Sequence, residues 1–497
     1  MRFFWALLGY TTSVRSPLRG LVLSLFVFFF CLSCSKPHPT AIAIIHVTVI
    51  DATGAPPQPH SIVLIEDSKI AAVGPDSSLR TPNGAQVIDA TGKFLIPGLA
   101  DMHVHLTGAG EPSGSREFIL PLLVANGVTT VRDMGGKSEL LKQLRDEIDS
   151  GKRLGPQIFF TGPYLDGDPP GYQPAIVVKT PAEARSAVDQ LAGEHVDFIK
   201  TQSRLERDPY FAIAEESQKK GIRFVGHVPD RVAVLEASQA GQASIEHLTG
   251  VLLGCSRKED ELRSEQFVPG PPNATPQQSL ARSRTWQREL LNSYSPDKAN
   301  ALFRAFVANG TWQVPTFPII VHFGFMTPRT DLSSDPRMVY VPQNERALWR
   351  QGVKDRMEFR TEADFVLREK VVKRYLDLVG KMQTAGVRIM AGTDLAAANV
   401  FPGSSLHEDL AFLVQAGLTP MQALQAATKN PAEFLGRQQI QGTIEPGQRA
   451  DLVLLDANPL EDIRNTEKIR AVVLQGKLLD RNALDAMLNR VAQFAAK

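Results

Sequence analysis

The stretch Phe94-Leu-Ile-Pro-Gly-Leu-Ala-Asp-Met-His-Val-His105 joins a run of apolar residues to two histidines spaced two positions apart. A short, continuous apolar run is typical of a strand that is buried on both faces of a parallel sheet. Because successive side chains of a strand point to opposite faces, we expect His103 and His105 to point the same way. Two imidazoles on one face near a strand end can supply half of a divalent metal site. The pair alone is a weak signal, since this spacing also arises by chance.

Seven further apolar stretches follow, and helical segments separate several of them. Eight strand-then-helix units predict an α/β fold, a (β/α)8 TIM barrel over residues 98–440, with the chemistry at the C-terminal strand ends. The long connections 256–310 and 319–386 are charged and mixed, and we expect helical insertions there. The eight predicted strands are Phe94–Leu106, Val128–Met134, Gln157–Pro163, Val196–Gln202, Ile222–Val228, Ala243–Leu248, Thr311–Phe317 and Val387–Asp394.

The ends of the other predicted strands carry residues that can bind a metal. Lys200 stands at the end of the fourth strand, His227 of the fifth, His247 of the sixth and Asp394 of the eighth. Each has a structural alternative, because His227 and His247 could be buried histidines bonded to backbone and Asp394 could cap a helix. Glu246 should point away from His247, which favours a structural ion pair. Since several potential ligands fall at equivalent places, we predict a metal site at this edge.

Strand signals outside the barrel lie near both ends of the chain. N-terminal strands alone would expose unpaired edges, for which C-terminal strands are natural partners. We therefore predict a small β-sandwich domain formed by residues 34–97 together with 441–490; the alternative is two unrelated β appendages. The segments with this character are 41–50, 61–66, 69–74, 86–89, 450–456 and 469–474.

Residues 1–33 differ in composition from the rest of the chain. They contain three arginines, no acidic residue and the ten-residue apolar run Leu21–Phe30, a signal-peptide pattern that is too short for a comfortable membrane span. Cys31-Leu-Ser-Cys34 resembles a bacterial lipoprotein box, except that Cys31 replaces the usual leucine. We expect a lipoprotein-type signal peptide over 1–33, lipidation at Cys34 and a place on the periplasmic side of the cell envelope. A plain secretory signal and an uncleaved anchor are the alternatives.

The overall composition excludes several classes of protein. With 43% hydrophobic and 22% charged residues, the 497-residue chain is typical of a globular protein with a substantial core. A net charge of +1 offers no electrostatic case for a nucleic-acid partner. Three cysteines cannot build a disulfide framework. Membrane contact is therefore expected only through an N-terminal lipid, and the oligomeric state stays open.

The strand-end motifs resemble those of the amidohydrolase superfamily, and within it the imidazolonepropionase-like and Xaa-Pro-dipeptidase-like secreted branch. The resemblance covers nearly all of the chain after the leader. It implies that His103, His105 and Asp394 hold one divalent metal and that His227 and His247 hold a second. The motifs are residues 94–105, Asp197-Phe-Ile-Lys200, Gly226-His227, Ile245-Glu-His247, Gly392-Thr-Asp394, Ala427-Thr-Lys-Asn-Pro431 and residues 442–454.

The resemblance also implies that Lys200, carboxylated by CO₂, bridges the two metals. An ammonium group would be repelled by two dications, whereas a carbamate is an anionic oxygen ligand suited to such ions. The alternative is a single metal, with Lys200 neutral or paired to a carboxylate. Zinc suits a set of histidine and carboxylate ligands best.

Such a site would hydrolyse an amide or an ester. A divalent ion lowers the pKa of its water from about 15.7 toward about 7. Asp394 can take a proton from this water and pass it to the leaving amine, while His247 or the second metal polarises the substrate carbonyl. We predict a metal-dependent amidohydrolase acting on a small amide, such as a dipeptide or an N-acyl amino acid. A lactonase or another esterase would use the same site.

Four residues are weaker candidates for substrate contact, namely Arg132, Tyr164, Tyr172 and His322. Arg132 could hold a substrate carboxylate, and an internal pair with Asp133 is the competing interpretation. Tyr164 and Tyr172 lie in a segment whose glycines and prolines fit a surface loop equally well. His322 follows the seventh predicted strand.

Two other classes of protein compete with a metal-dependent hydrolase. A Schiff-base lyase would use Lys200 as its nucleophile. Such a mechanism would give no function to the four histidines at the strand ends. A non-catalytic envelope lipoprotein could keep the scaffold as a binding module, and the intact ligand set speaks against it.

Overall fold

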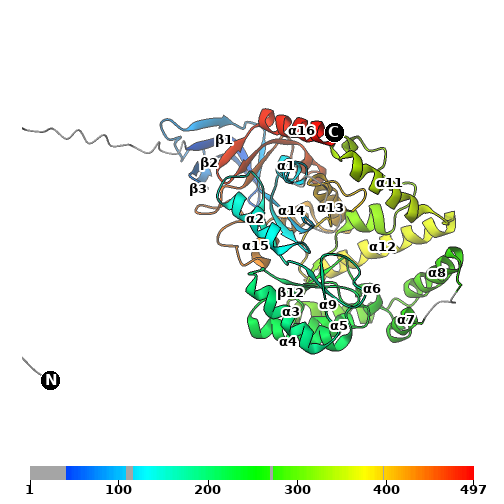
Figure 1. The fold of residues 1–497 in the computed structure, drawn as a ribbon. Helices are drawn as coiled ribbons and strands as arrows, with labels where there is room; N and C mark the ends of the chain where they lie inside the picture. Colours follow the sequence, from blue (N-terminus) through cyan, green and yellow to red (C-terminus); the bar gives the residue numbers. More distant parts are fainter. Residues whose placement is uncertain (1–40, 108–115, 269–272, 396) are drawn as a thin grey trace, which may run out of the picture. The chain divides into compact units, whose positions relative to one another are not determined.

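The first and the last strands of the chain belong to one hydrogen-bonded sheet (Figure 1). The computed structural model describes residues 41–107, 116–268, 273–395 and 397–497, so the predicted signal peptide and Cys34 lie outside the described residues. The strand order is β17-β16-β15-β5-β1-β2-β3, with β4 paired to β1. The strands are β1 Ile42–Val49, β2 Gln58–Glu66, β3 Lys69–Pro75, β4 Gln86–Asp89, β5 Phe94–Pro97, β15 Leu452–Leu455, β16 Ile469–Leu474 and β17 Lys477–Leu479.

The two chain ends meet where β5 pairs with β15. Leu95 lies opposite Leu454 in this antiparallel ladder, and both side chains enter one buried apolar cluster together with Val49 and Val473. The period of two along a strand places alternate residues on that shared face. The ends therefore build one sheet around a common core, and the alternative of two unrelated appendages is wrong.

The predicted C-terminal limit of this domain needs a correction. Residues 481–490 were expected within the sandwich, but Arg481–Ala495 forms helix α16. The side chain of Asp480 accepts a hydrogen bond from the backbone N–H of Ala483, which caps the first turn of the helix.

The middle of the chain forms two parallel sheets. One has the order β6-β7-β8 and the other the order β10-β9-β11-β12-β13-β14. The strands are shorter than the stretches predicted from the sequence, because their outer residues make single backbone bonds instead of continuous ladders. Their bounds are β6 Leu99–Val104, β7 Val128–Asp133, β8 Gln157–Phe160, β9 Tyr164–Asp166, β10 Ala175–Val177, β11 Ile199–Thr201, β12 Phe224–Gly226, β13 Ser244–Glu246 and β14 Trp312–Val314.

The eighth predicted strand, Val387–Asp394, corresponds to no named strand in the described part of the chain. This segment makes an isolated parallel bridge from Ile389 to Gln313 of β14, and the backbone N–H of Met102 in β6 donates to the carbonyl of Ala391. Asp394 has a φ of 60°, which ends the extended conformation. The segment therefore lies between β14 and β6, where the eighth unit of the predicted barrel is expected.

The long connections are helical, as predicted. The first contains α7, α8 and α9, and the second contains η1, η2, α11 and α12. Within the described residues, no helix is long and apolar enough to cross a membrane. The helices are α1 Ile119–Ala125, α2 Ser138–Asp149, α3 Pro181–Gly193, α4 Arg207–Lys220, α5 Val234–Gln239, α6 Val251–Gly254, α7 Glu259–Gln266, α8 Pro276–Asn292, α9 Pro296–Asn309, α10 Phe317–Ile319, η1 Ile320–Gly324, η2 Pro336–Tyr340, α11 Gln343–Met357, α12 Glu362–Thr384, α13 Ser404–Gln415, α14 Pro420–Ala426, α15 Lys429–Phe434, η3 Ile463–Glu467 and α16 Arg481–Ala495.

Candidate metal centre

Two histidines and one aspartate converge beside β6. His105 Nε2 lies 2.9 Å from Asp394 Oδ1, and His103 Nε2 lies 3.4 Å from the same oxygen. One ligand atom from each of the three residues falls within 4.8 Å of the others, a spacing that suits a metal ion. His103 is the fifth residue of β6 and His105 follows its end, so the alternation of the strand brings both imidazoles to one side.

The structure brings the other predicted ligands to the same place. The ring of His247 lies 4.5 Å from that of His103 and 4.9 Å from that of His227, measured between centroids. His247 Nε2 is 3.8 Å from Asp394 Oδ2. Lys200, on β11, lines the same cavity as these four residues. The predicted metal-ligating residues therefore form one cluster.

Gly226 makes room for Lys200 in this cluster. Val225 of β12 lies opposite Lys200 of β11 in the parallel ladder. A Cβ atom at position 226 would lie 2.7 Å from Lys200 Cδ and 2.4 Å from the carbonyl oxygen of Thr201. Since neither distance is compatible with normal packing, only glycine fits before His227.

Each of the four histidines uses its Nδ1 atom for a contact outside the cluster. His103 Nδ1 lies 2.8 Å from Glu246 Oε2, and His105 Nδ1 lies 3.2 Å from the carbonyl oxygen of Gly135. Carboxylate and carbonyl oxygens only accept, so both Nδ1 atoms carry the proton. The unprotonated Nε2 atoms of His103 and His105 then face Asp394. An outer-shell acceptor of this kind orients a histidine that ligates a metal.

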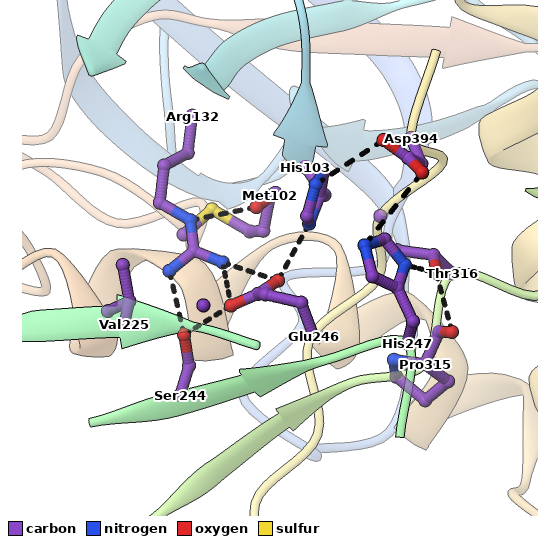
Figure 2. A network of polar contacts seen from close by, with 12 residues as sticks. Met102, His103, Arg132, Val225, Ser244, Glu246, His247, Pro315, Thr316 and Asp394 are labelled. Carbon is purple, nitrogen blue, oxygen red and sulfur yellow. Dashed lines mark hydrogen bonds and ion pairs between the residues drawn. The ribbon is translucent and has the colours of Figure 1, made fainter. Parts of the chain in front are cut away.

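In the other two histidines, His247 and His227, the Nδ1 atom contacts a hydroxyl group. His247 Nδ1 lies 2.6 Å from Thr316 Oγ1, and that hydroxyl donates to the carbonyl oxygen of Pro315 (Figure 2). Thr316 Oγ1 therefore accepts a hydrogen bond from the protonated Nδ1 of His247, which leaves the lone pair of His247 Nε2 free for a metal. His227 Nδ1 lies 2.7 Å from Ser203 Oγ. This tautomer favours the metal-ligand role of His247 over the carbonyl-polarising role that was also predicted for it.

A buried ion pair between Arg132 and Glu246 holds the carboxylate that contacts His103 Nδ1. Figure 2 shows the guanidinium of Arg132 reaching both carboxylate oxygens of Glu246, at 2.9 and 3.1 Å. Arg132 also donates to Ser244 Oγ and to the carbonyl oxygen of Met102. Both charged side chains are fully buried. Glu246 is thus the structural pair partner that the sequence predicted.

The predicted substrate contact of Arg132 is wrong, and so is its alternative pairing with Asp133. All of the hydrogen bonds of the Arg132 guanidinium run to β6 and β13, which holds the group beneath the histidines. The carboxylate of Asp133 instead accepts from the backbone N–H groups of Leu106 and Gly135. Neighbouring residues of a strand point to opposite faces, so an Arg–Asp pair at adjacent positions is disfavoured.

Burial and charge set the protonation of the cluster. Burial lowers the pKa of Lys200 from 10.5 to about 8, although the carboxylates of Glu246 and Asp394 oppose the shift. Burial lowers the pKa of His247 to about 4. For Asp394 burial acts to raise the pKa, but His247 and His105 outweigh it and hold the pKa at about 2. At neutral pH the cluster therefore contains a carboxylate and an uncharged His247.

These residues fit a divalent ion. His103 Nε2 is buried, faces the other ligands and has no hydrogen-bond partner among the described residues. Imidazole nitrogens and a carboxylate are the ligands that zinc prefers. His247, Thr316 and Asp394 all have a positive φ, between 55° and 60°. Such a conformation costs a non-glycine residue about 1–2 kcal/mol and recurs at functional sites.

The cluster opens into a cavity of about 830 Å³. Tyr164 and Tyr172, both predicted as weak candidates, line it, and the hydroxyl of Tyr164 lies 3.3 Å from His105 Nδ1. His322 is not among the described lining residues. In η1, His322 Nδ1 lies 3.2 Å from the carbonyl oxygen of Thr330, and its ring centroid lies 5.9 Å from that of Phe412. The predicted substrate contact of His322 is therefore corrected.

One wall of the cavity was not predicted. Helix α11 of the second insertion contributes Glu345, Leu348, Trp349, Gly352 and Arg356 to the lining. Their spacing of three, four, seven and eleven positions is that of one helix face. This pattern is visible in the sequence, but the surface on which the face packs is not.

Comparisons with known proteins agree with this geometry. The Amidohydrolase family profile matches residues 343–479. Ochratoxinase from Aspergillus niger is 23% identical over 494 residues, covering 87% of this chain and 84% of that protein. Imidazolonepropionase from Geobacillus kaustophilus (strain HTA426) is 24% identical over 413 residues, covering 79% of this chain and 83% of that protein.

A solved structure shares the fold. The structure of a Xaa-Pro dipeptidase with bound methionine in the active site has a TM-score of 0.64 and 22% sequence identity. The similarity covers 89% of this chain and 100% of that one. The family match and the long alignments support the amidohydrolase superfamily, and the solved structure agrees in fold.

Proposed function

We propose that this chain hydrolyses the carbon–nitrogen bond of a small amide, such as a dipeptide or an N-acyl amino acid, at a centre of one or two divalent ions, with zinc as the preferred metal. Hydrolysis of carbon–nitrogen bonds is common to its relatives. The observation that carries the proposal is the convergence of four histidines, Asp394 and Lys200, with every Nδ1 occupied elsewhere.

The residues of the cluster would have different roles in metal binding and proton transfer. His103, His105 and Asp394 would hold one ion, and His227 and His247 a second. A bound divalent ion supplies an acidified water and polarises the substrate carbonyl. Asp394, a carboxylate at neutral pH, accepts the proton of the attacking water and delivers it to the leaving amine. Tyr164 closes one side of the site beside His105.

Lys200 would join the two halves as a carbamate. Formation of a carbamate consumes the uncharged amine, and burial makes that form more abundant by lowering the pKa of Lys200 to about 8. At a fixed partial pressure of CO₂, the carbamate should therefore increase between pH 7 and pH 9, about two units below the range of an exposed lysine. The measurement is the carbonyl resonance after incubation with ¹³CO₂. A spectrum identical to that of Lys200→Met would contradict the carbamate.

The central experiment joins metal analysis to a substrate screen. The purified protein, loaded with zinc or manganese, should hold at least one ion per chain and cleave dipeptides or N-acyl amino acids. We expect His103→Ala to lose metal and at least about 10-fold in activity, since even a change in the outer shell of a metal site typically costs about 10- to 100-fold. His322→Ala serves as the control, because His322 lies outside the cavity. Less than about half an ion per chain, with full activity in His103→Ala, would rule out the metal mechanism. Lactones and esters in the same screen test the alternative substrates.

We further propose export to the periplasmic side of the cell envelope with a lipid on Cys34. The support is the sequence pattern of residues 1–33 and the lipobox-like Cys31–Cys34 segment. The full chain should incorporate a labelled fatty acid and fractionate with membranes. Cys34→Ala should abolish the label, whereas Cys255→Ala, a change at a buried thiol, should keep it. Labelling that survives Cys34→Ala would exclude lipidation at this residue.

A further inference from the structure

Helix α11 presents two charged residues at the ends of one apolar face of the cavity. Glu345 and Arg356 are eleven positions apart, which corresponds to about 16 Å along the helix axis. Leu348, Trp349 and Gly352 lie between them and also line the cavity. This face is too long for the smallest dipeptides and suits a substrate with a bulky apolar group.

The middle of this face of α11 is apolar and can pack against a bulky apolar group of a substrate. Trp349 is only 6% exposed, whereas Leu348 is 60% exposed, and both line the cavity. A Cβ atom at Gly352 would lie 3.3 Å from Cε2 of Phe323. Glycine inside a helix is disfavoured, but here it leaves room for the Phe323 ring, which packs close to α11 and also lines the cavity.

Arg356 carries a charge that no acidic group neutralises in the described part of the chain. Its guanidinium carbon lies 4.2 Å from the centroid of the Phe323 ring, and none of the ion pairs found within the described residues includes Arg356. Asp364, whose charge acts on Arg360 and Arg368, is already held by Arg284 and Thr361.

The surroundings of Arg356 add to this excess of positive charge. Arg368 is buried, and its pKa falls to about 10 because of burial and then because of the charges of Arg360 and Arg356. At the other end of the face, Glu345 is buried and has no ion pair with any described residue. It is also too far along the helix to neutralise Arg356. A planar guanidinium that stacks on an aromatic ring is well suited to a carboxylate, which it can bind through two parallel hydrogen bonds.

We propose that Arg356 selects the substrate: it binds the free carboxylate of an amide whose bulky apolar group packs against Phe323 and Trp349. The substrate class is then an N-acyl amino acid with an aromatic or large aliphatic group. This inference rests on the proposed function and refines it, because it assigns substrate discrimination to the second insertion and leaves the chemistry to the histidine cluster.

The test compares two substrates that differ only in charge. Release of benzoate is followed from N-benzoyl-phenylalanine and from its uncharged primary amide, with the metal-loaded enzyme. Arg356→Met should raise KM for the acid by about 10- to 100-fold through the loss of a charge-assisted pair. It should change KM for the uncharged amide less than about threefold and leave kcat nearly unchanged. Arg356→Lys should fall between the two, since the charge stays but the bidentate geometry is lost.

Arg350→Met is the matched control, because Arg350 is an exposed arginine of the same helix that does not line the cavity. It should leave both substrates unaffected. Equal losses for the acid and the amide in Arg356→Met, or the same effect in Arg350→Met, would overturn the proposal, as would an enzyme that neither binds nor cleaves the acid.

A binding measurement tests the carboxylate site at Arg356 independently of the proposed hydrolase activity. Titration calorimetry with N-benzoyl-phenylalanine should show binding to the wild type and at least tenfold weaker binding to Arg356→Met, whether or not the amide is cleaved. Selective binding without hydrolysis would support the carboxylate site and refute the hydrolase. Amide hydrolysis that is indifferent to Arg356 in both assays would support the hydrolase and refute the carboxylate site.

Discussion

Asp394→Asn should lower kcat of the metal-loaded enzyme by about 10²- to 10⁴-fold, the range typical of a lost general acid–base group. An amide has nearly the same shape as a carboxylate, but it cannot accept the proton of the attacking water. Asp394 lies within 4 Å of His103, His105 and His247. The measurement is kcat at saturating substrate, with metal content determined on the same sample.

Asparagine is the informative substitution because the backbone here has a φ of 60°. Asparagine and aspartate tolerate this left-handed conformation better than other non-glycine residues, so the change adds little strain. Asp485→Asn, at an exposed residue of α16 that pairs with Arg481, is the control and should leave kcat unaffected. A kcat within threefold of the wild type in Asp394→Asn would exclude Asp394 as the proton carrier.

The largest effect on stability is expected from Arg132→Met. The substitution removes the arginine that pairs with Glu246 and leaves a fully buried carboxylate whose charge no arginine neutralises, although His103 and Ser244 still contact it. Loss of one member of a buried pair destabilises a protein by about 3–5 kcal/mol. The free energy of unfolding in urea should fall by this amount.

Two further variants make this prediction specific. Arg132→Met combined with Glu246→Gln should recover part of the loss, because the second change removes the unpaired charge. Lys142→Met breaks a pair on α2 whose side chains are 54% and 61% exposed, and it should cost less than about 1 kcal/mol. Similar losses in Arg132→Met and Lys142→Met would show that the buried pair contributes no more than a surface one.

The potential metal ligands could be predicted from the sequence, because their positions depend on short segments of the chain. His103 and His105 are two positions apart, and the alternation of a strand settles their common side. His227 and His247 directly follow short buried strands, and Lys200 is the last residue but one of another. Parallel strands bring equivalent ends to one edge. The alternation also favoured a structural pair for Glu246.

The residues that hydrogen-bond to these ligands could not be predicted from the sequence in the same way. Glu246 meets His103 across 143 positions and Arg132 across 114, and Thr316 meets His247 across 69. Many buried acceptors could have served, and no local pattern ranks them. The sequence therefore suggested a substrate role or an Asp133 pair for Arg132, and both were wrong.

The sequence by itself determined the α/β class, the pairing of both chain ends in one β domain and the identity of the potential metal ligands, because strand periodicity and strand ends are local properties. Only the tertiary structure decided which tautomer each histidine takes, that residues 387–394 bridge β14 and β6 without forming a regular strand, and that one face of α11 lines the cavity. These features depend on packing between segments far apart in the chain, where small differences in orientation decide which side chains meet.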